Sequence, residues 1–310
     1  MSITRKLKLC GEFGVKVVLS DIAAVNIRIP CLTSRFKDRV ILRWLREHYG
    51  QVLREYQPLT PCTESVTDAS RLPVWSMWFQ GESDAPELVR ICLESTRANC
   101  GEHPFHVLTS GNLSEYLSLP GYVFDRLKEG GMKTAHFSDI VRMSLLAEYG
   151  GLWLDAAVFT ASRIPEEVFA HEYYTVRHKT DINDRNVALQ RWTTYLQAAH
   201  KGNVLCRFVR DIMLEYWKAQ TTFIDYVMTD YFIALAYEDL PLCRELLDAV
   251  PMNNPRIEDM MPLLDKKYSE EAYEELTRET SFFKLTYKQD FRKSINGQET
   301  LYGYLSGSYR

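Results

Sequence analysis

Features of membrane and secreted proteins are scarce in this 310-residue sequence. Even the apolar segment at residues 15–30 is interrupted by Asp21 and Arg28, so it falls short of the roughly 20 uncharged residues that a membrane span requires. The seven cysteines are an odd number and form no Cys-x-x-Cys pair, unlike those of a disulfide scaffold or a structural zinc site. The basic first residues are not followed by the apolar core of a cleavable leader. We therefore expect a cytoplasmic protein.

Excess positive charge is also missing. The sequence has 37 Lys and Arg residues against 41 Asp and Glu residues, which gives a net charge of −4. A protein that binds nucleic acid uses a basic excess to displace counterions from phosphates, so we expect no nucleic-acid partner. The charge is uneven, because residues 1–60 carry 11 basic and five acidic side chains. The first 60 residues are therefore basic, and the rest of the chain is acidic.

The basic N-terminal part contains a predicted amphipathic helix. Its apolar residues recur at helical spacing, with basic residues largely on the other side, and they are Phe36, Val40, Ile41, Trp44, Leu45, Val52 and Leu53. Either this helix packs on its own domain, which we favour, or it rests on anionic lipid at the inner face of the plasma membrane. A segment rich in Pro, Thr and Ser follows at residues 57–73. We therefore divide the chain into a helical extension with a linker, residues 1–70, and a domain at residues 71–310.

From residue 74 the chain alternates between predicted strands and predicted helices. Short apolar runs at residues 74–79 and 105–109 are typical of strands that are buried on both faces. Between them Asp84 is expected to open a helix, and residues 112–116 and 122–128 have a helical pattern. This order predicts an α/β fold, in which helices flank a mainly parallel sheet.

Residues 133–165 are the most informative stretch. Ser138 is expected to cap a helix, which places Asp139 in the first turn, where the helix dipole favours an anion. Gly150 and Gly151 end that helix, and the apolar residues 152–154 form a buried strand. This strand delivers Asp155 to the carboxyl edge of the sheet, where ligands bind in such folds.

Three motifs follow one another in the sequence. They are Leu-Pro-Val-Trp-Ser-Met-Trp-Phe-Gln-Gly at residues 72–81, Ser-Asp-Ile-Val-Arg at residues 138–142 and Tyr-Gly-Gly-Leu-Trp-Leu-Asp at residues 149–155. Together they resemble the capsular polysaccharide synthesis proteins, which are similar to glycosyltransferase family 32, and the similarity extends from about residue 70 to residue 290. The resemblance implies a GT-A fold with a mixed sheet, a UDP-sugar donor, a divalent metal ion such as Mn²⁺ or Mg²⁺, and retention of the anomeric configuration.

The chemistry of such a transferase explains why carboxylates and cations belong together. Departure of a nucleoside diphosphate builds up negative charge, which a metal ion or cationic side chains must neutralise. The related families carry Asp-x-Asp at the end of this strand, whereas this sequence has Asp155, Ala156 and Ala157. By resemblance Asp155 is the catalytic and metal-binding carboxylate, and further ligands come from the diphosphate, water or a distant side chain. The alternative is an acid that only caps the following turn.

The resemblance assigns further residues to the sugar nucleotide. Asp139 would bond to ribose or sugar hydroxyls, and Arg142 would order the pocket or contact the sugar or the phosphate. Because these two residues lie three positions apart, a simple ion pair on one helix face is the alternative. Gln80 and Gly81 follow the first strand, where GT-A proteins receive the nucleotide base.

Two later blocks complete the predicted site. Asp230 is our candidate for the polar group beneath the sugar ring, and an exposed helix face is the alternative. In the block Lys-Leu-Thr-Tyr-Lys at residues 284–288, Lys284 or Lys288 would contact the diphosphate by resemblance. The alternative is a surface strand with outward-facing lysines.

We therefore expect a retaining glycosyltransferase. It would move a hexose, with galactose or glucose favoured, from a UDP-sugar to a lipid-linked or growing capsular polysaccharide of the cell surface. Peripheral contact with an anionic membrane would bring the enzyme to such an acceptor. The alternative is a non-catalytic module that binds a sugar nucleotide or a glycan and has lost the second acid of Asp-x-Asp.

Overall fold

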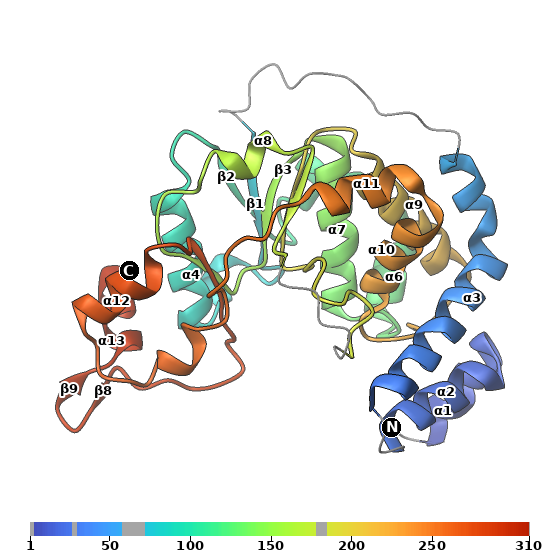
Figure 1. The fold of residues 1–310 in the computed structure, drawn as a ribbon, viewed down its shortest axis with the longest axis horizontal. Helices are drawn as coiled ribbons and strands as arrows, with labels where there is room; N and C mark the ends of the chain where they lie inside the picture. Colours follow the sequence, from blue (N-terminus) through green and yellow to red (C-terminus); the bar gives the residue numbers. More distant parts are fainter. Residues whose placement is uncertain (1–2, 27–29, 58–71, 178–184, 310) are drawn as a thin grey trace.

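A five-stranded sheet forms the centre of the fold (Figure 1). The computed structural model of the protein describes residues 3–26, 30–57, 72–177 and 185–309. In spatial order the strands are β2 (Phe105–Leu108), β1 (Val74–Met77), β3 (Gly151–Leu154), β6 (Leu196–Ala199) and β5 (Tyr173–Thr175). Strand β1 is parallel to β2 and β3, whereas β6 is antiparallel to β3 and β5. All strands except β6 therefore run the same way, and the predicted α/β fold with a mixed, mainly parallel sheet is confirmed.

Helices cover both faces of the sheet. The helices that follow β1 in sequence are α4 (Glu87–Asn99), α5 (Leu113–Tyr116), α6 (Gly121–Lys128), α7 (Thr134–Glu148), α8 (Glu167–Ala170), α9 (Val204–Ala219), α10 (Met228–Asp239), α11 (Pro241–Ala249), α12 (Glu270–Thr277) and α13 (Leu301–Ser308). Strand β3 is buried on both sides, because Trp153 packs in one apolar cluster with α7 while Leu152 and Leu154 pack in another with α8.

Three N-terminal helices pack on this domain. They are α1 (Ile3–Phe13), α2 (Val15–Asn26) and α3 (Pro30–Tyr56), and α3 lies beside α9 and α10 at one end of the molecule (Figure 1). The apolar side of α3, including Trp44 and Leu45, belongs to the same apolar cluster as α9 and α10, as the favoured interpretation predicts. Most of the predicted linker at residues 57–73, and the boundary at residue 70 with it, lies outside the described residues, so the domain division stays a prediction.

The C-terminal part of the chain returns to the sheet edge. Strand β4 (Val158–Thr160) follows β3 closely and pairs with β7 (Phe282–Lys284) in an antiparallel register that sets Val158 opposite Lys284. A small hairpin of β8 (Ser294–Ile295) and β9 (Gln298–Glu299) precedes α13. This pairing brings Lys284, which lies far from Asp155 in sequence, to the end of β3.

Two predicted helix starts are displaced along the sequence. Helix α4 begins at Glu87, whereas Asp84 ends a 3₁₀ turn, because Pro86 disfavours a helical conformation of Ala85, whose backbone is extended. Helix α7 begins at Thr134, so Ser138 is not its cap and Asp139 lies in the second turn. His136 and Phe137, which precede Ser138, are buried, so the buried face of α7 starts earlier than the capping pattern indicates.

A close crossing of backbone segments fixes the start of β3. Gly151 adopts φ +100°, and a Cβ at this position would lie 2.1 Å from the carbonyl oxygen of Pro73. Only glycine fits this approach, which lets β3 follow α7 after a short turn. Among the described residues, no helix combines the length and the apolar character that crossing a membrane demands.

Candidate functional site

A pocket of about 320 Å³ opens at the carboxyl ends of β1 and β3. This central pocket is lined by residues 77–80, by Thr134, Ala135, Ser138, Asp139 and Arg142 of α7, by Trp153 and residues 155–157, by Thr194, by Tyr226, Val227, Thr229 and Asp230, and by Lys284 and Tyr287. Most of the residues predicted for the site therefore come together, although they derive from five separate parts of the chain. Gln80 lines the pocket, and Gly81 lies beside it without lining it.

Asp155 follows the last residue of β3 and faces this pocket. Its backbone N–H donates to the carbonyl of Tyr195 over 2.9 Å, which continues the pairing of β3 with the segment that leads into β6. Its carboxylate accepts hydrogen bonds from Trp153 Nε1 and from Lys284 Nζ, each over 3.0 Å. Because the side chain is 35% exposed, a ligand in the pocket can reach it. Burial acts to raise the pKa of Asp155, but the charges of Lys284 and Arg142 outweigh it and hold this pKa below its usual value.

Arg142 is the buried centre of the pocket wall. Its side chain is 2% exposed, and its guanidinium donates to the carboxylate of Asp139 and to the backbone carbonyl of Thr194. The same group lies 3.8 Å from the carboxylate of Asp155. Asp139 also accepts from the hydroxyl of Thr229 over 2.5 Å. The predicted ion pair of Asp139 and Arg142 therefore exists, but it forms in the wall of the pocket and not on an outer helix face.

Asp230 lies in the first turn of α10, where it separates the central pocket from a neighbouring one. Its side chain accepts a hydrogen bond from Trp192 Nε1 over 3.0 Å, and the residue is only 8% exposed. The interpretation of Asp230 as part of an exposed helix face is therefore wrong. Burial raises the pKa of Asp230 to about 6, although the bond from Trp192 acts in the opposite direction.

The two predicted lysines lie at the mouth of a second hollow, the outer pocket, which shares Asp155, Tyr226 and Tyr287 with the central pocket. Lys284 points inward to Asp155, so it is not an outward-facing surface lysine. Lys288 is exposed and lines the outer pocket but not the central pocket. Both positive charges therefore face the same cleft.

The residues present do not form a metal site by themselves. Among the described residues, no three His, Cys, Asp or Glu side chains gather closely enough to hold a metal ion. Asp155 already accepts bonds from Trp153 and Lys284, and Ala157 supplies no second carboxylate. The charge at this edge of the sheet is balanced by cationic side chains of the protein.

Comparison with known proteins identifies the family of this chain. The family described as capsular polysaccharide synthesis protein matches residues 26–305. The chain belongs to this family. One solved structure, named PaToxG glycosyltransferase, matches 80% of this chain and 95% of its own length at 12% identity with a TM-score of 0.40. None of the curated proteins matches the chain.

Membership in the capsular polysaccharide synthesis family confirms the resemblance that the three motifs carry, and it supports a transferase. The roles of the individual residues stay predictions. No motif pointed to Thr194 or Glu258, and none of the predicted roles falls on Thr229, which directly precedes Asp230. Thr194 and Thr229 hold Arg142 and Asp139 in place, and Glu258 lines the outer pocket. Thr194 and Glu258 lie outside the family motifs, and only the fold brings these two residues to the cleft.

Proposed function

We propose that this protein is a retaining glycosyltransferase that moves a hexose, galactose or glucose in the first place, from a UDP-sugar to a lipid-linked or growing capsular polysaccharide. Family membership supports a role in capsule synthesis. The observation that carries the proposal is the cationic surround of Asp155, with Lys284 at 3.0 Å and Arg142 at 3.8 Å from its carboxylate. Fixed positive charge at the edge of the sheet is suited to an anionic leaving group.

The diphosphate of the donor lies near Lys284 and Lys288. An ammonium group has three N–H donors, so Lys284 can keep its bond to Asp155 and still donate to phosphate oxygens. The nucleoside lies toward Gln80, Gly81 and Asp139. A carboxylate can accept more than two hydrogen bonds, so Asp139 can receive a ribose hydroxyl in addition to its bonds from Arg142 and Thr229.

The transfer breaks one bond and forms one bond at the same sugar carbon. The bond from C1 to the β-phosphate oxygen breaks, and its electron pair stays on that oxygen. An oxygen of the acceptor bonds to C1 on the same face, and its proton passes to the departing phosphate. Lys284 stabilises the charge on the leaving group, and Asp230 presents a polar group beneath the sugar ring. A divalent metal ion, if bound, would add Lewis acid stabilisation of the diphosphate, with Asp155 as its ligand.

Release of UDP from UDP-glucose and UDP-galactose by the purified chain tests the proposal. We expect slow hydrolysis of at least one donor by the wild type and a decrease of about tenfold or more in Asp155→Asn, because this change frees Lys284 from its position. Asp125→Asn on α6 is the matched control, since Asp125 is exposed and does not line the pocket, and it should leave the rate unchanged. Parallel reactions with Mn²⁺, Mg²⁺ and a chelator test the metal expectation.

Two outcomes would contradict this assignment. If the wild type binds UDP saturably but turns over no donor, with or without an added saccharide acceptor, the chain is a binding module. If the wild type binds no UDP, the cleft has another ligand.

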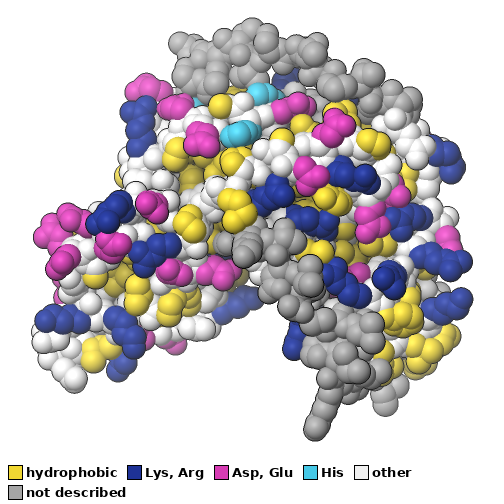
Figure 2. Space-filling model, viewed as in Figure 1, with side chains coloured by type: hydrophobic (Ala, Val, Ile, Leu, Met, Phe, Trp, Pro, Cys, Tyr) yellow, Lys and Arg dark blue, Asp and Glu magenta, His cyan; other side chains and the backbone are white. Residues whose placement is uncertain are grey.

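The N-terminal helices provide a surface for an anionic membrane. Large apolar side chains are exposed on α1, α2 and α3, namely Leu7, Val15, Leu19 and Phe36. Exposed basic residues such as Lys8, Lys16 and Arg39 accompany them, and hydrophobic side chains lie next to Lys and Arg side chains over this end of the molecule in Figure 2. A lipid-linked acceptor would be reached from such a surface.

Sedimentation with vesicles tests this surface. We expect the wild type to sediment with vesicles that contain phosphatidylglycerol and not with vesicles of phosphatidylcholine alone, since each basic residue contributes about 1 kcal/mol near anionic lipid. The double change Val15→Asp with Leu19→Asp should abolish sedimentation, whereas Met252→Asp, at an equally exposed position far along the chain, should not. Equal sedimentation of all three proteins would contradict the proposal.

A further inference from the structure

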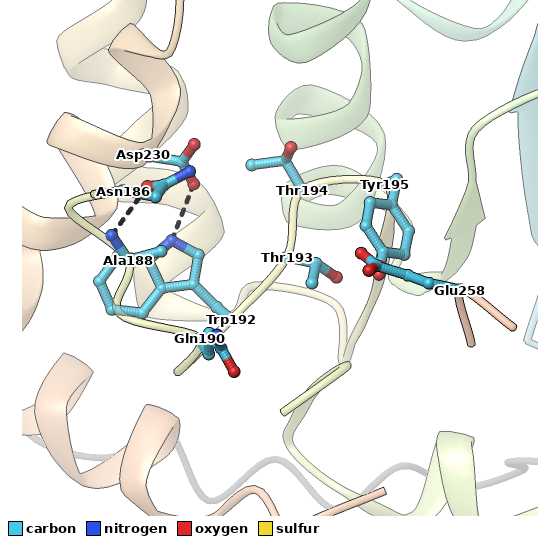
Figure 3. A pocket seen from close by; sticks show the side chains of 9 residues that line it. All are labelled: Asn186, Ala188, Gln190, Trp192, Thr193, Thr194, Tyr195, Asp230 and Glu258. Atoms are coloured by element: carbon cyan, nitrogen blue, oxygen red, sulfur yellow. Dashed lines mark hydrogen bonds between the residues drawn. The ribbon is translucent and has the colours of Figure 1, made fainter. Parts of the chain in front are cut away.

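A third hollow, the side pocket, adjoins the central pocket on the side of Asp230 (Figure 3). This side pocket shares Thr194 and Asp230 with the central pocket and Glu258 with the outer pocket. Among the described residues, no Lys or Arg lines it. Its lining instead consists mainly of amides, hydroxyls and two carboxylates, which both donate and accept hydrogen bonds.

A tight turn before β6 builds one wall of the side pocket. Two consecutive residues of the turn, Leu189 and Gln190, have left-handed backbone angles of φ 52° and φ 58°, which are uncommon outside glycine. Arg191 holds the turn, because its guanidinium donates to the carbonyls of Ala188 and Val187 over 3.0 and 3.1 Å. The same guanidinium lies over an aromatic ring of Tyr237 at 4.2 Å from the centroid. The turn that places Gln190 at the pocket is therefore fixed.

The residues that flank this turn orient Asp230 on the same side of the pocket (Figure 3). Asp230 is oriented by Trp192 Nε1, and the side chain of Asn186 also bonds to it. The carbonyl oxygen of the Asn186 side chain accepts from the backbone N–H of Ala188 over 2.9 Å, so the amide nitrogen faces Asp230. Asp230 and Asn186 are thus held in place before any ligand binds, which reduces the entropy lost on binding.

We propose that the side pocket binds an uncharged sugar ring of the acceptor glycan. This inference rests on the proposed transferase function and names the place of its second substrate. Sugar hydroxyls can pair with the amide of Gln190 and the carboxylates of Asp230 and Glu258, whereas these two acids repel a phosphate. Lys284 and Lys288 attract the phosphate to the other part of the cleft. The boundary at Thr194 and Asp230 is then where the acceptor hydroxyl meets the donor sugar.

Binding of simple glycosides, followed by saturation-transfer NMR, tests the inference. The probes are methyl β-galactoside and methyl α-glucoside, with glucose 1-phosphate as the charged counterpart and UDP as the ligand of the donor part. We expect the wild type to bind at least one methyl glycoside, and Gln190→Ala and Glu258→Gln each to weaken that binding about fivefold. UDP affinity should be unchanged in Gln190→Ala and not lowered in Glu258→Gln, because Glu258 also lines the outer pocket and its negative charge opposes a phosphate there. Lys288→Met should give the reverse pattern. Glu271→Gln on α12 is the control for loss of an exposed acid.

Several outcomes would overturn the inference while leaving the donor assignment intact. The first is a wild type that binds UDP but no glycoside, and the second is displacement of the glycoside by UDP. The third is glycoside binding that neither Gln190→Ala nor Glu258→Gln weakens. The fourth is a Gln190-dependent affinity for glucose 1-phosphate that exceeds the affinity for the methyl glycosides. Failure of UDP to bind, with glycoside binding still dependent on Gln190 and Glu258, would instead overturn the donor assignment alone. Because Glu258 is exposed, its variant keeps the test valid even if Gln190→Ala disturbs the turn.

Discussion

Replacement of Arg142 by methionine is expected to lower the free energy of unfolding by about 3–5 kcal/mol. The guanidinium is almost fully buried, and its removal leaves the carboxylate of Asp139 and the carbonyl of Thr194 without their charged donor. Loss of one partner from a buried pair costs more than the pair itself contributes, because the remaining charge has left water without compensation. Urea denaturation of the wild type and the variant measures this difference.

Two further variants make that result specific. Arg142→Lys keeps the charge but loses the planar fork that reaches two acceptors, so its stability should lie between those of the wild type and the methionine variant. Arg43→Met removes an arginine that is 78% exposed and pairs with Glu47 on the same helix, and the free energy of unfolding should change by less than about 0.5 kcal/mol. A change of less than 1 kcal/mol in Arg142→Met would show that Arg142 is not the structural centre of the site.

Replacement of Lys284 by methionine is expected to slow donor turnover by about 100- to 1,000-fold. The ammonium is held 3.0 Å from Asp155 and opens onto the cleft, so it is already in place when charge develops on the departing diphosphate. A group that acts mainly on this developing charge affects kcat more than KM. Steady-state release of UDP, with kcat and KM determined separately, measures the effect.

The comparison with other lysine variants separates chemistry from folding. Lys284→Arg keeps the positive charge that Lys284→Met removes, so it should retain part of kcat. If Lys284 only stabilised the fold, the arginine variant would not recover kcat selectively. Lys218→Met removes an exposed lysine that pairs with Glu215 on the surface of α9, and its turnover should equal that of the wild type. If Lys284→Met raises KM and leaves kcat unchanged, Lys284 binds the donor without assisting the departure of UDP.

The sequence predicts the centre of the fold well because the central strands are short and buried on both faces. An apolar run between Pro73 and Gly81 marks β1, an apolar run after Gly150 marks β3, and the position of Asp155 follows directly from the end of β3. Helix starts are predicted less well. The Ser138 pattern fits a cap, but burial of His136 and Phe137 extends α7 by a turn, so packing with distant residues overrides the local signal.

The network around the site is harder to predict for a physical reason. Nothing local distinguishes a buried arginine from an exposed one, because the burial of Arg142 depends on the carbonyl of Thr194, which arrives from the segment before β6. Gln190 and Glu258 lie in irregular segments without periodicity, so only the tertiary structure reveals that they face one cleft. The family motifs therefore indicate the central pocket around Asp155 and not Gln190 and Glu258 of the side pocket.

The unequal distribution of charge in the cleft has a further consequence. Positive side chains line the part near β7, while the hollow beside Asp230 has carboxylates and amides in its place. The two ends of the groove therefore differ in charge, so an elongated molecule with one anionic and one hydroxylated end binds in one orientation in preference to the reverse. Long-range electrostatics thus orients the molecule before it forms hydrogen bonds with individual side chains.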